Sequence, residues 1–392
     1  MRVYSDTNEE AIRARDLLKD WHGEGYLTAE QYKLMEQETV CELRRTNHFL
    51  RAVLFFFTLI IAVAVLGLCI YNELGIGFLV VFCAIIGYAA AELAVFRFQL
   101  YRYGIEEALA SISVGFLCAG LLAIGGSGES KSDAEIIALT AGALASLWIW
   151  HRFGLPYAFL ASMIFLVWLP GYFTSSHTAQ HLSVAAVYIV ALAIVIAIRP
   201  RHRLTYLNEH FSIAEALLWL GIYLAINLRL SSPNLIGLSW SGNWTTADFG
   251  SSFYWATWAL TWCLPPAVLF RGLRNKDRYV LWTGTLVAML TLFTNKLYLG
   301  WPRHTWDPIL FGLLLIGLAL FIRRWLANAP DGIRHGFTAR RLSAKDKSWI
   351  DLGSTAFGLA SPNTLPASPH SSHPTTHFSG GDSGGAGATS DF

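Results

Sequence analysis

Residues 50–71 read LRAVLFFFTLIIAVAVLGLCIY. A helix needs about 20 mostly apolar residues to cross the hydrocarbon core of a bilayer, and this stretch is long enough. Nine more apolar stretches follow it along the chain. The ten predicted spans cover residues 50–71, 75–96, 107–125, 134–151, 153–172, 182–198, 213–230, 251–270, 279–299 and 308–325. The sequence therefore predicts an all-α fold, a polytopic transmembrane bundle of about ten helices.

The composition agrees with a membrane protein and argues against nucleic-acid binding. Of the 392 residues, 54% are hydrophobic and only 14% are charged, whereas soluble domains carry about 25% charged residues. The net charge of +2 gives no broad basic field. In the first predicted helix, Arg13, Arg15 and Lys19 are balanced by acidic neighbours, so there is no stripe to follow phosphates. We expect membrane lipids, and no nucleic acid, as partners.

The basic residues between the spans fall mostly on one side of the bundle, ten against four. The richer side holds Arg97, Arg102, Arg152, Arg199, Arg201, Arg203, Arg271, Arg274, Lys276 and Arg278. The other side holds Lys131, Arg229, Lys296 and Arg303. Both terminal regions add further basic residues to the richer side. Because cytoplasmic loops carry an excess of Lys and Arg, we expect both termini in the cytoplasm, which an even number of spans also requires.

Two terminal regions flank the predicted bundle. The first is a helical hairpin, with one helix from Asn8 to Trp21, a glycine-containing turn, and a second helix opened by the capping-box spacing of Thr28 and Gln31. The end of the chain is rich in Gly, Ser, Thr and Pro, which predicts disorder. Either region could bind a cytosolic protein. The predicted parts are the hairpin 1–48, the bundle 49–326, a basic segment 327–352 and the disordered tail 353–392.

Several polar residues near the span ends fit helix caps. Ser212 with Glu215, and Ser132 with Glu135, have capping-box spacing. Asp307 followed by proline fits an N-cap with Pro at the first helical position. We therefore interpret Glu215 as a cap rather than as a proton site within the membrane.

Three intramembrane polar residues have no capping motif: Glu92, Asn227 and Arg229. We expect Glu92 to pair with Arg97 or Arg102 or to extend toward the interface, with a coupling carboxylate as the alternative. Asn227 and Arg229 end the seventh span, where long polar side chains commonly reach the interface. No span has an ionisable residue near its middle, which argues against a transporter built on a carboxylate or histidine relay.

A cluster of aromatic and charged residues marks the predicted outer face. Aromatic faces with cations and carboxylates suit sugar rings or lipid headgroups, so a ligand-binding outer rim is one interpretation. The alternative is an aromatic belt, because Trp and Tyr gather at membrane interfaces. The candidate rim consists of Asn295, Lys296, Trp301, Arg303, His304 and Trp306, with Trp240 and Trp244 from the preceding outer loop.

The sequence contains no catalytic constellation, and we expect neither a cofactor nor a metal. His177 and His181 have the spacing that lets two imidazoles share a metal on one helical turn, but no HExxH glutamate accompanies them. Four of the five cysteines lie in apolar segments, and none forms a CxxC pair, so buried structural thiols are the simplest interpretation.

The opening region resembles the N-terminal part of an uncharacterised family of bacterial multi-pass predicted membrane proteins. The resemblance covers about residues 10–70 and consists of a hydrophobic helix, a glycine turn, a capped second helix and the start of the first span. It implies a bacterial inner membrane and no known reaction, so no catalytic residue is transferred. The residues that carry it are Leu17, Leu18, Trp21, Gly25, Leu27, Thr28, Glu30, Gln31, Arg44, Arg45 and the span from Leu50.

Two functions remain open at this point. The favoured one is a non-enzymatic envelope scaffold or sensor, in which the hairpin and the tail bind cytosolic partners. The alternative is a carrier or transferase for envelope lipids or saccharides that uses the outer aromatic loops.

Overall fold

The computed structural model describes most of the first 339 residues. The described residues are 2–23, 25–39, 43–70, 76–125, 131–202, 205–231, 249–301, 304, 306–328, 333–334 and 337–338. The chain divides into two compact units, residues 1–339 and 340–392. All described residues belong to the first unit, so the predicted tail 353–392 lies outside them.

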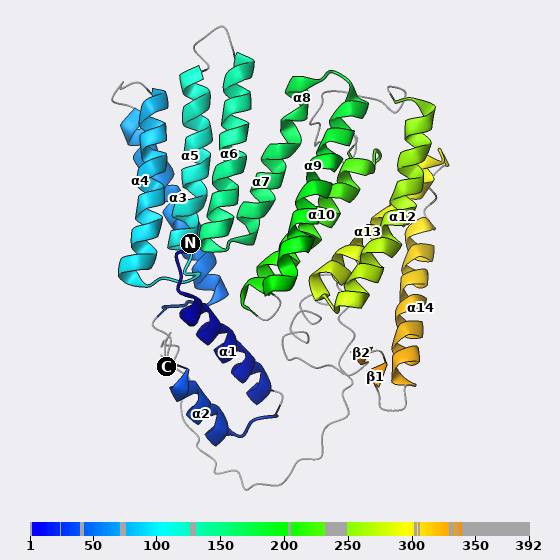
Figure 1. Ribbon diagram of the computed structural model, residues 1–392, viewed down its shortest axis with the longest axis horizontal. Helices are drawn as coiled ribbons and strands as arrows, with labels where there is room; N and C mark the ends of the chain where they lie inside the picture. Colours follow the sequence, from blue (N-terminus) through cyan, green and yellow to red (C-terminus); the bar gives the residue numbers. More distant parts are fainter. Residues whose placement is uncertain are drawn as a thin grey trace, which may run out of the picture. The chain divides into compact units, whose positions relative to one another are not determined.

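The described part of the chain is almost entirely helical, as predicted (Figure 1). The helices are α1 Asp6–Gly23, α2 Ala29–Glu38, α3 His48–Ile70, α4 Ile76–Phe98, α5 Ile105–Gly125, α6 Lys131–Phe153, α7 Pro156–Trp168, α8 Pro170–Phe173, α9 His177–Ile198, α10 Leu207–Ile226, α12 Ser251–Asn275, α13 Arg278–Tyr298 and α14 Asp307–Ala327. A 3₁₀ turn, η1 Arg199–His202, extends α9, and the short strands β1 Ile333–Arg334 and β2 Phe337–Thr338 pair antiparallel after α14.

Eight of these helices, some with a short extension, are long and apolar enough to cross a membrane. They are α3, α4, α5, α6, α7 with α8, α9 with η1, α10 and α13. The protein is therefore a multi-pass, all-α membrane bundle. Each predicted span coincides with a helix, although α12 and α14 are not among the eight. The Trp, Ser and Pro residues of α12 lower its hydropathy.

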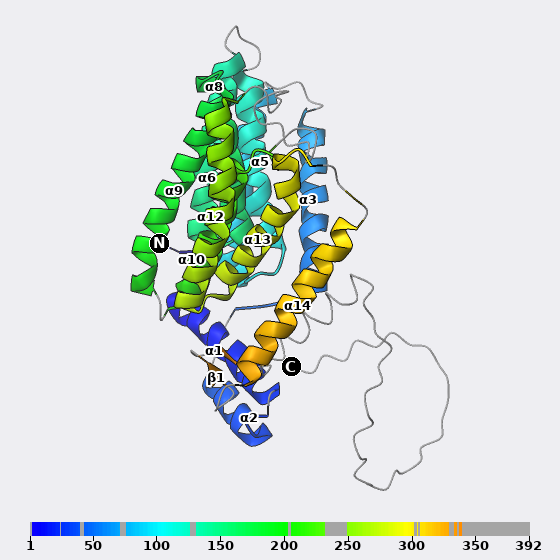
Figure 2. The same cartoon turned by 90° about the vertical axis from the view of Figure 1, so that its right-hand side faces the viewer.

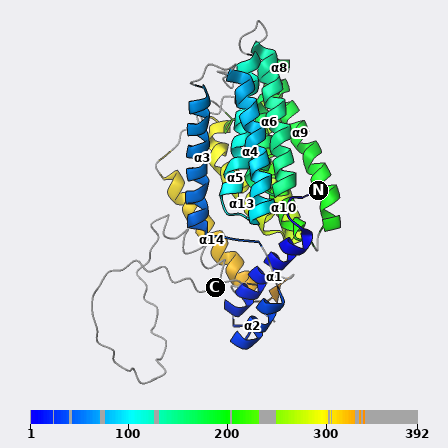
Figure 3. The ribbon, with the colours of Figure 1, turned by 90° about the vertical axis from the view of Figure 1, so that its left-hand side faces the viewer.

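The membrane helices form two packed groups. In the first, α5 contacts α3, α4 and α6, and α6 packs against α7. In the second, α10 contacts α9, α12 and α13, and α12 packs against α13 (Figure 2). Figure 3 shows α3 at the edge of the first group. Phe159 and Met163 of α7 enter one apolar core with Tyr188 of α9 and Leu218 of α10, which joins the two groups.

The tight turn between α6 and α7 depends on Gly154. Its φ of +70° is a conformation that residues with a side chain rarely adopt. A Cβ at this position would also lie 2.6 Å from a guanidinium nitrogen of Arg2. The turn lets α6 and α7 pack against each other.

The predicted hairpin is present as α1 and α2. Its capping box is confirmed: the Thr28 hydroxyl accepts from the Gln31 backbone N–H at 3.2 Å, and the Gln31 side chain accepts from the Thr28 N–H at 3.0 Å. The helix α1 packs through a side that includes Ile12 and Leu18, which are buried, whereas Leu17 and Trp21 are exposed.

Close approach of α4 and α5 depends on two glycines. A Cβ on Gly120 would lie 2.8 Å from the backbone nitrogen of Val81, and one on Gly77 would lie 2.8 Å from the backbone nitrogen of Ile124. Small residues let helix backbones approach within a membrane, where dispersion contacts drive association. Gly115 lies on the same helix as Gly120, but a Cβ there would meet no atom of another residue within 4 Å.

We predict opposite effects for one added methyl group at these two positions of α5. Gly120→Ala should lower the free energy of unfolding by about 1–3 kcal/mol, because the methyl group meets backbone atoms that cannot move aside. Gly115→Ala should leave stability unchanged or raise it, because alanine favours the helix and the space is open. Thermal unfolding of both variants in one detergent measures the difference. Equal melting temperatures would contradict the packing described here.

Candidate functional site

The predicted outer rim is only partly assembled in the structure. The Asn295 side-chain oxygen accepts from the indole nitrogens of Trp258 at 3.1 Å and Trp262 at 3.2 Å. The Lys296 ammonium forms an ion pair with Asp307 at 2.5 Å. Asn295 and Lys296, two of the candidate rim residues, are therefore bound to side chains of neighbouring helices of the same chain.

Of the other rim residues, some are exposed and some lie outside the part of the chain that the structure describes. Trp301 and Trp306 are 59% and 68% exposed, and the backbone N–H of His304 donates to Asp307. Arg303, Trp240 and Trp244 lie outside the described residues, so the ligand-binding rim that includes them stays a prediction. The N-cap prediction for Asp307 is wrong: Asp307 is the first residue of α14, and its carboxylate reaches back to His304 and Lys296 instead of capping the helix.

Glu92 forms an ion pair, but with a different arginine from the two predicted. Both of its oxygens accept from the Arg152 guanidinium, each at 2.7 Å, and the Tyr88 hydroxyl donates to one of them at 2.7 Å. The expected pairing with Arg97 or Arg102 is therefore wrong. Arg152 stands at the end of α6, 60 residues away, and a partner that distant cannot be identified from the local sequence.

Asn227 and Arg229 both form hydrogen bonds with residues of the same chain. Asn227 is fully buried, and its amide donates to the Tyr223 hydroxyl at 2.8 Å and to the Thr294 hydroxyl at 3.0 Å. The Arg229 guanidinium donates to the Tyr254 hydroxyl at 2.7 Å and lies over its ring. The expectation is therefore wrong for the fully buried Asn227. The partly buried Arg229 lies just beyond the end of α10, and its reach to the interface stays a prediction.

The capping interpretation of Glu215 is also wrong. The helix α10 begins at Leu207, so Glu215 is its ninth residue and lies well inside the helix, fully buried. Its two oxygens accept from Arg199 at 2.6 Å and from Arg271 at 2.8 Å. A span with a buried, charged residue in its interior therefore exists, contrary to the expectation that none would be found.

Ser212 likewise forms a hydrogen bond with a residue next to a neighbouring helix and does not cap its own helix. Its hydroxyl donates to Asp277 at 2.6 Å, and the same aspartate pairs with Arg199 at 2.5 Å and caps the start of α13. Two arginines and two carboxylates thus neutralise one another, and they tie η1, α10, α12 and α13 together. Isolated buried charges are costly, whereas a matched and hydrogen-bonded set is tolerated.

The second predicted capping box also fails. The helix α6 begins at Lys131, so Ser132 and Glu135 lie within it. Glu135 accepts from the Tyr172 hydroxyl at 2.7 Å, which links α6 to α8.

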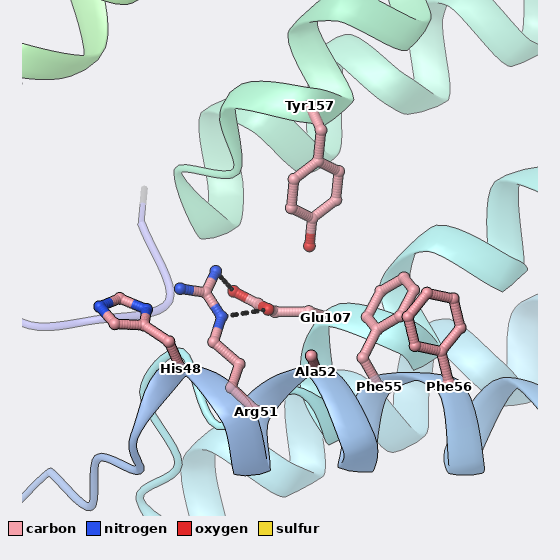
Figure 4. A pocket seen from close by; sticks show the side chains of 7 residues that line it. All are labelled: His48, Arg51, Ala52, Phe55, Phe56, Glu107 and Tyr157. Carbon is pink, nitrogen blue, oxygen red and sulfur yellow. Dashed lines mark hydrogen bonds and ion pairs between the residues drawn. The ribbon is translucent and has the colours of Figure 1, made fainter. Parts of the chain in front are cut away.

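An open cavity of about 340 Å³, with a charged pair at one end and mostly apolar lining, lies between α3, α5 and α7 (Figure 4). Arg51 of α3 donates to Glu107 of α5 through two nitrogens, at 2.8 and 2.5 Å. The Glu107 side chain is only 3% exposed. In Figure 4 the Tyr157 hydroxyl points toward this pair from the opposite side. The cavity is lined by His48, Arg51, Ala52, Phe55, Phe56, Glu107 and Tyr157.

Gly104 keeps α3 close to this cavity. Its φ of +104° favours glycine, and any Cβ there would meet the carbonyl oxygen of Arg51. The next buried carboxylate, Glu106, accepts from the Tyr103 backbone N–H at 2.7 Å. The loop before α5 is therefore fixed against both helices that carry the Arg51–Glu107 pair.

Arg51, Glu107 and Tyr157 were not predicted as site residues from the sequence. One signal was available, because Arg51 and Glu107 are opposite charges at the starts of two predicted spans. Their pairing depends on α3 packing against α5, which the sequence did not reveal.

The histidine pair is placed at the start of α9. His181 bonds the carbonyl oxygen of Ala225 at 2.8 Å, and His177 contacts Gln180 at 3.4 Å. Within the described ranges, no group of three His, Cys, Asp or Glu residues is arranged to hold a metal ion.

We predict that the two glutamates assigned to caps differ strongly in their contribution to stability. Glu215→Ala should lower the free energy of unfolding by about 3–5 kcal/mol, because it leaves two arginines without their buried counter-charge. Glu135→Ala removes one hydrogen bond near the surface and should cost about 1 kcal/mol or less. Thermal unfolding in detergent compares the two, and a similar loss in both would contradict the buried network.

Comparison with known proteins adds no family or relative to this geometry. No protein-family model, no curated protein and no solved structure matches the chain. The function must therefore be inferred from the contacts of the chain's own residues.

Proposed function

We propose that this protein is a non-enzymatic scaffold or sensor of the bacterial inner membrane, with a cytoplasmic hairpin, α1 and α2, that binds a protein partner. The observation that carries this proposal is the attachment of the hairpin to both groups of membrane helices. Because the hairpin contacts both groups, its position depends on the arrangement of the membrane helices, and a partner bound to it would sense a change in that arrangement.

The first attachment joins the hairpin to the α3–α7 group. The backbone N–H of Val3 donates to the carbonyl of Arg152 at 3.0 Å. Tyr4 and Ile12 are buried in one apolar core with Val95 of α4 and Phe153 of α6. The start of α1 is thus packed into the bundle rather than suspended from it.

The second attachment joins the hairpin to the α9–α13 group. The Tyr206 hydroxyl, directly before α10, donates to Asp6 at 2.6 Å. Arg2 lies over the Tyr206 ring, 5.2 Å from its centroid, and pairs with Glu9 at 2.7 Å. Burial raises the pKa of the Glu9 carboxyl, and the Arg2 guanidinium opposes that rise. The hydrogen bond and the cation–π contact therefore join the N-terminal segment directly to the residue that precedes α10.

The far part of the hairpin offers an apolar surface to a partner. None of the residues of α2 is buried. Exposed apolar patches on a protein surface commonly mark interaction sites. The large apolar side chains exposed there are Leu17 at 43%, Trp21 at 47%, Tyr26 at 66%, Leu34 at 61% and Met35 at 40%.

The distribution of arginines supports a cytoplasmic hairpin. Arg152 contacts the N-terminal segment directly, and Arg102 lies over the ring of Tyr101, which in turn contacts Tyr4. The hairpin therefore shares one end of the bundle with arginines of the basic side. By the positive-inside rule that end faces the cytoplasm. Membership of the bacterial family that the opening region resembles is part of the same proposal.

The alternative, a carrier or transferase for envelope lipids or saccharides, has narrower support. The exposed indoles of Trp301 and Trp306 favour it. The engagement of Asn295 and Lys296 by residues of the same chain disfavours it, because a ligand would have to displace those contacts.

We predict that a partner can be cross-linked at the hairpin in living cells. A photo-reactive amino acid at Leu34 should capture one cytosolic protein, and Met35→Glu should abolish the capture by charging the same surface. The same probe at Trp306, which is comparably exposed, is the control and should not capture that protein. Capture that persists in the Met35→Glu variant, or no protein capture at Leu34, would overturn the proposal.

We also predict that the two ends of α14 lie on opposite sides of the membrane. In a cysteine-free variant, a cysteine at Asn328 should react with an impermeant maleimide only after the cells are opened. A cysteine at Trp301 should react in intact cells. The reverse pattern would place the termini outside the cytoplasm.

A further inference from the structure

We propose that the cavity between α3, α5 and α7 binds the phosphate headgroup of a membrane phospholipid, with an acyl chain lying along α3. This site goes beyond the scaffold or sensor role, and its test does not depend on the hairpin partner.

The cavity lies where three membrane helices begin. His48 is the first residue of α3, Glu107 is the third of α5 and Tyr157 is the second of α7. Residues at the start of a span lie at the depth of lipid headgroups. Helix N-termini also carry partial positive charge, which favours an anionic group. The depth of the cavity in the membrane and the partial positive charge of the helix N-termini therefore both favour a phosphate group.

Arg51 supplies the cation, and Glu107 orients it. Two of the three guanidinium nitrogens of Arg51 donate to Glu107, while the third points toward His48 in Figure 4. A guanidinium has five N–H donors, so the contact with Glu107 leaves donors for a phosphate oxygen. A buried carboxylate that fixes an arginine reduces the entropy lost when a ligand binds.

Tyr157 supplies a hydroxyl from the opposite wall. Figure 4 shows it directed toward the Arg51–Glu107 pair. A phenol can donate to a phosphate oxygen or to an ester carbonyl of the glycerol backbone. Its side chain is well placed to contact the headgroup without taking part in the ion pair.

The remaining lining suits an acyl chain. Ala52, Phe55 and Phe56 follow Arg51 along α3, and Phe56 is 62% exposed. Beyond them α3 has no buried residue within its most apolar stretch, so its apolar surface is open to lipid. A free phosphate would contact only the polar end, where Arg51 is already paired with Glu107, and would leave the apolar lining without a partner. An amphipathic phospholipid uses both ends.

The test measures lipid affinity of the full-length protein in detergent. Dioctanoyl phosphatidylglycerol is the probe, and dioctanoylglycerol, which has the same chains without phosphate, is its matched control. Binding is followed by isothermal titration calorimetry and by the rise in melting temperature that a native-state ligand produces. We expect the phosphate-bearing lipid to bind more tightly by about tenfold, as charge-assisted hydrogen bonds would give. Equal affinity for the two lipids would overturn the headgroup assignment.

Three variants locate the binding. Arg51→Gln/Glu107→Gln removes both charges together and should weaken phosphatidylglycerol binding by about tenfold. Tyr157→Phe removes one hydroxyl and should weaken it by a factor of about three to ten. The control Lys296→Gln/Asp307→Asn removes an ion pair of similar geometry in another part of the bundle and should not change affinity.

Two further outcomes are decisive. If the Arg51→Gln/Glu107→Gln variant fails to fold, Tyr157→Phe and His48→Gln carry the test, and unchanged affinity in both would overturn the proposal. A large excess of inorganic phosphate should not displace the lipid. Full displacement would assign the cavity to a soluble anion instead of a phospholipid.

Discussion

The requirement that a buried charge be matched determines how the helices of this bundle meet. Glu215 has no exposed surface, and the two arginines that neutralise it come from η1 and α12. Arg199 also pairs with Asp277, which caps the start of α13. In a low-dielectric interior an unmatched member of this set would cost several kcal/mol, so the four elements must adopt positions that bring all the charges together. The buried carboxylate of Glu107 imposes the same constraint between α3 and α5 through Arg51, and the partly exposed Arg152–Glu92 pair links α6 to α4.

Capping motifs illustrate how far local sequence predicts this structure. The pattern at Thr28–Gln31 forms the expected cap at the start of α2, a helix without a buried residue. The same spacing at Ser212–Glu215 does not, because Arg271 and Asp277 become available only when α10 packs against α12 and α13. The apolar spans were predictable because the bilayer acts on each helix separately. The partners of the polar residues were not, because they depend on packing between helices that are distant in the sequence.

The candidate outer rim and the cavity between α3, α5 and α7, here called the basal cavity, differ in how many of their polar side chains already have hydrogen-bond partners within the chain. Asn295 and Lys296 were predicted to bind a ligand from their residue types alone, and the structure gives both of them partners within the chain. The basal cavity was not predicted, yet its arginine is paired through only two of its nitrogens and faces an open, partly apolar space. A polar residue in a membrane protein is thus better judged by its remaining hydrogen-bonding capacity than by its type.

The basal cavity and the hairpin are connected through the backbone. Arg44, just before α3, donates its N–H to Gln99 at 2.8 Å and accepts from the N–H of Tyr101 at 3.0 Å. Tyr101 packs edge-on against Tyr4 of the N-terminal segment, 4.8 Å between ring centroids. The same loop approaches α3 closely at Gly104, where a Cβ would meet the carbonyl oxygen of Arg51. Direct contacts therefore connect the start of α3, near the cavity, to the segment that holds the hairpin. Lipid binding at the cavity and partner binding at the hairpin would be thermodynamically linked if both changed the position of this loop, and linkage would then make each ligand alter the affinity for the other by the same factor.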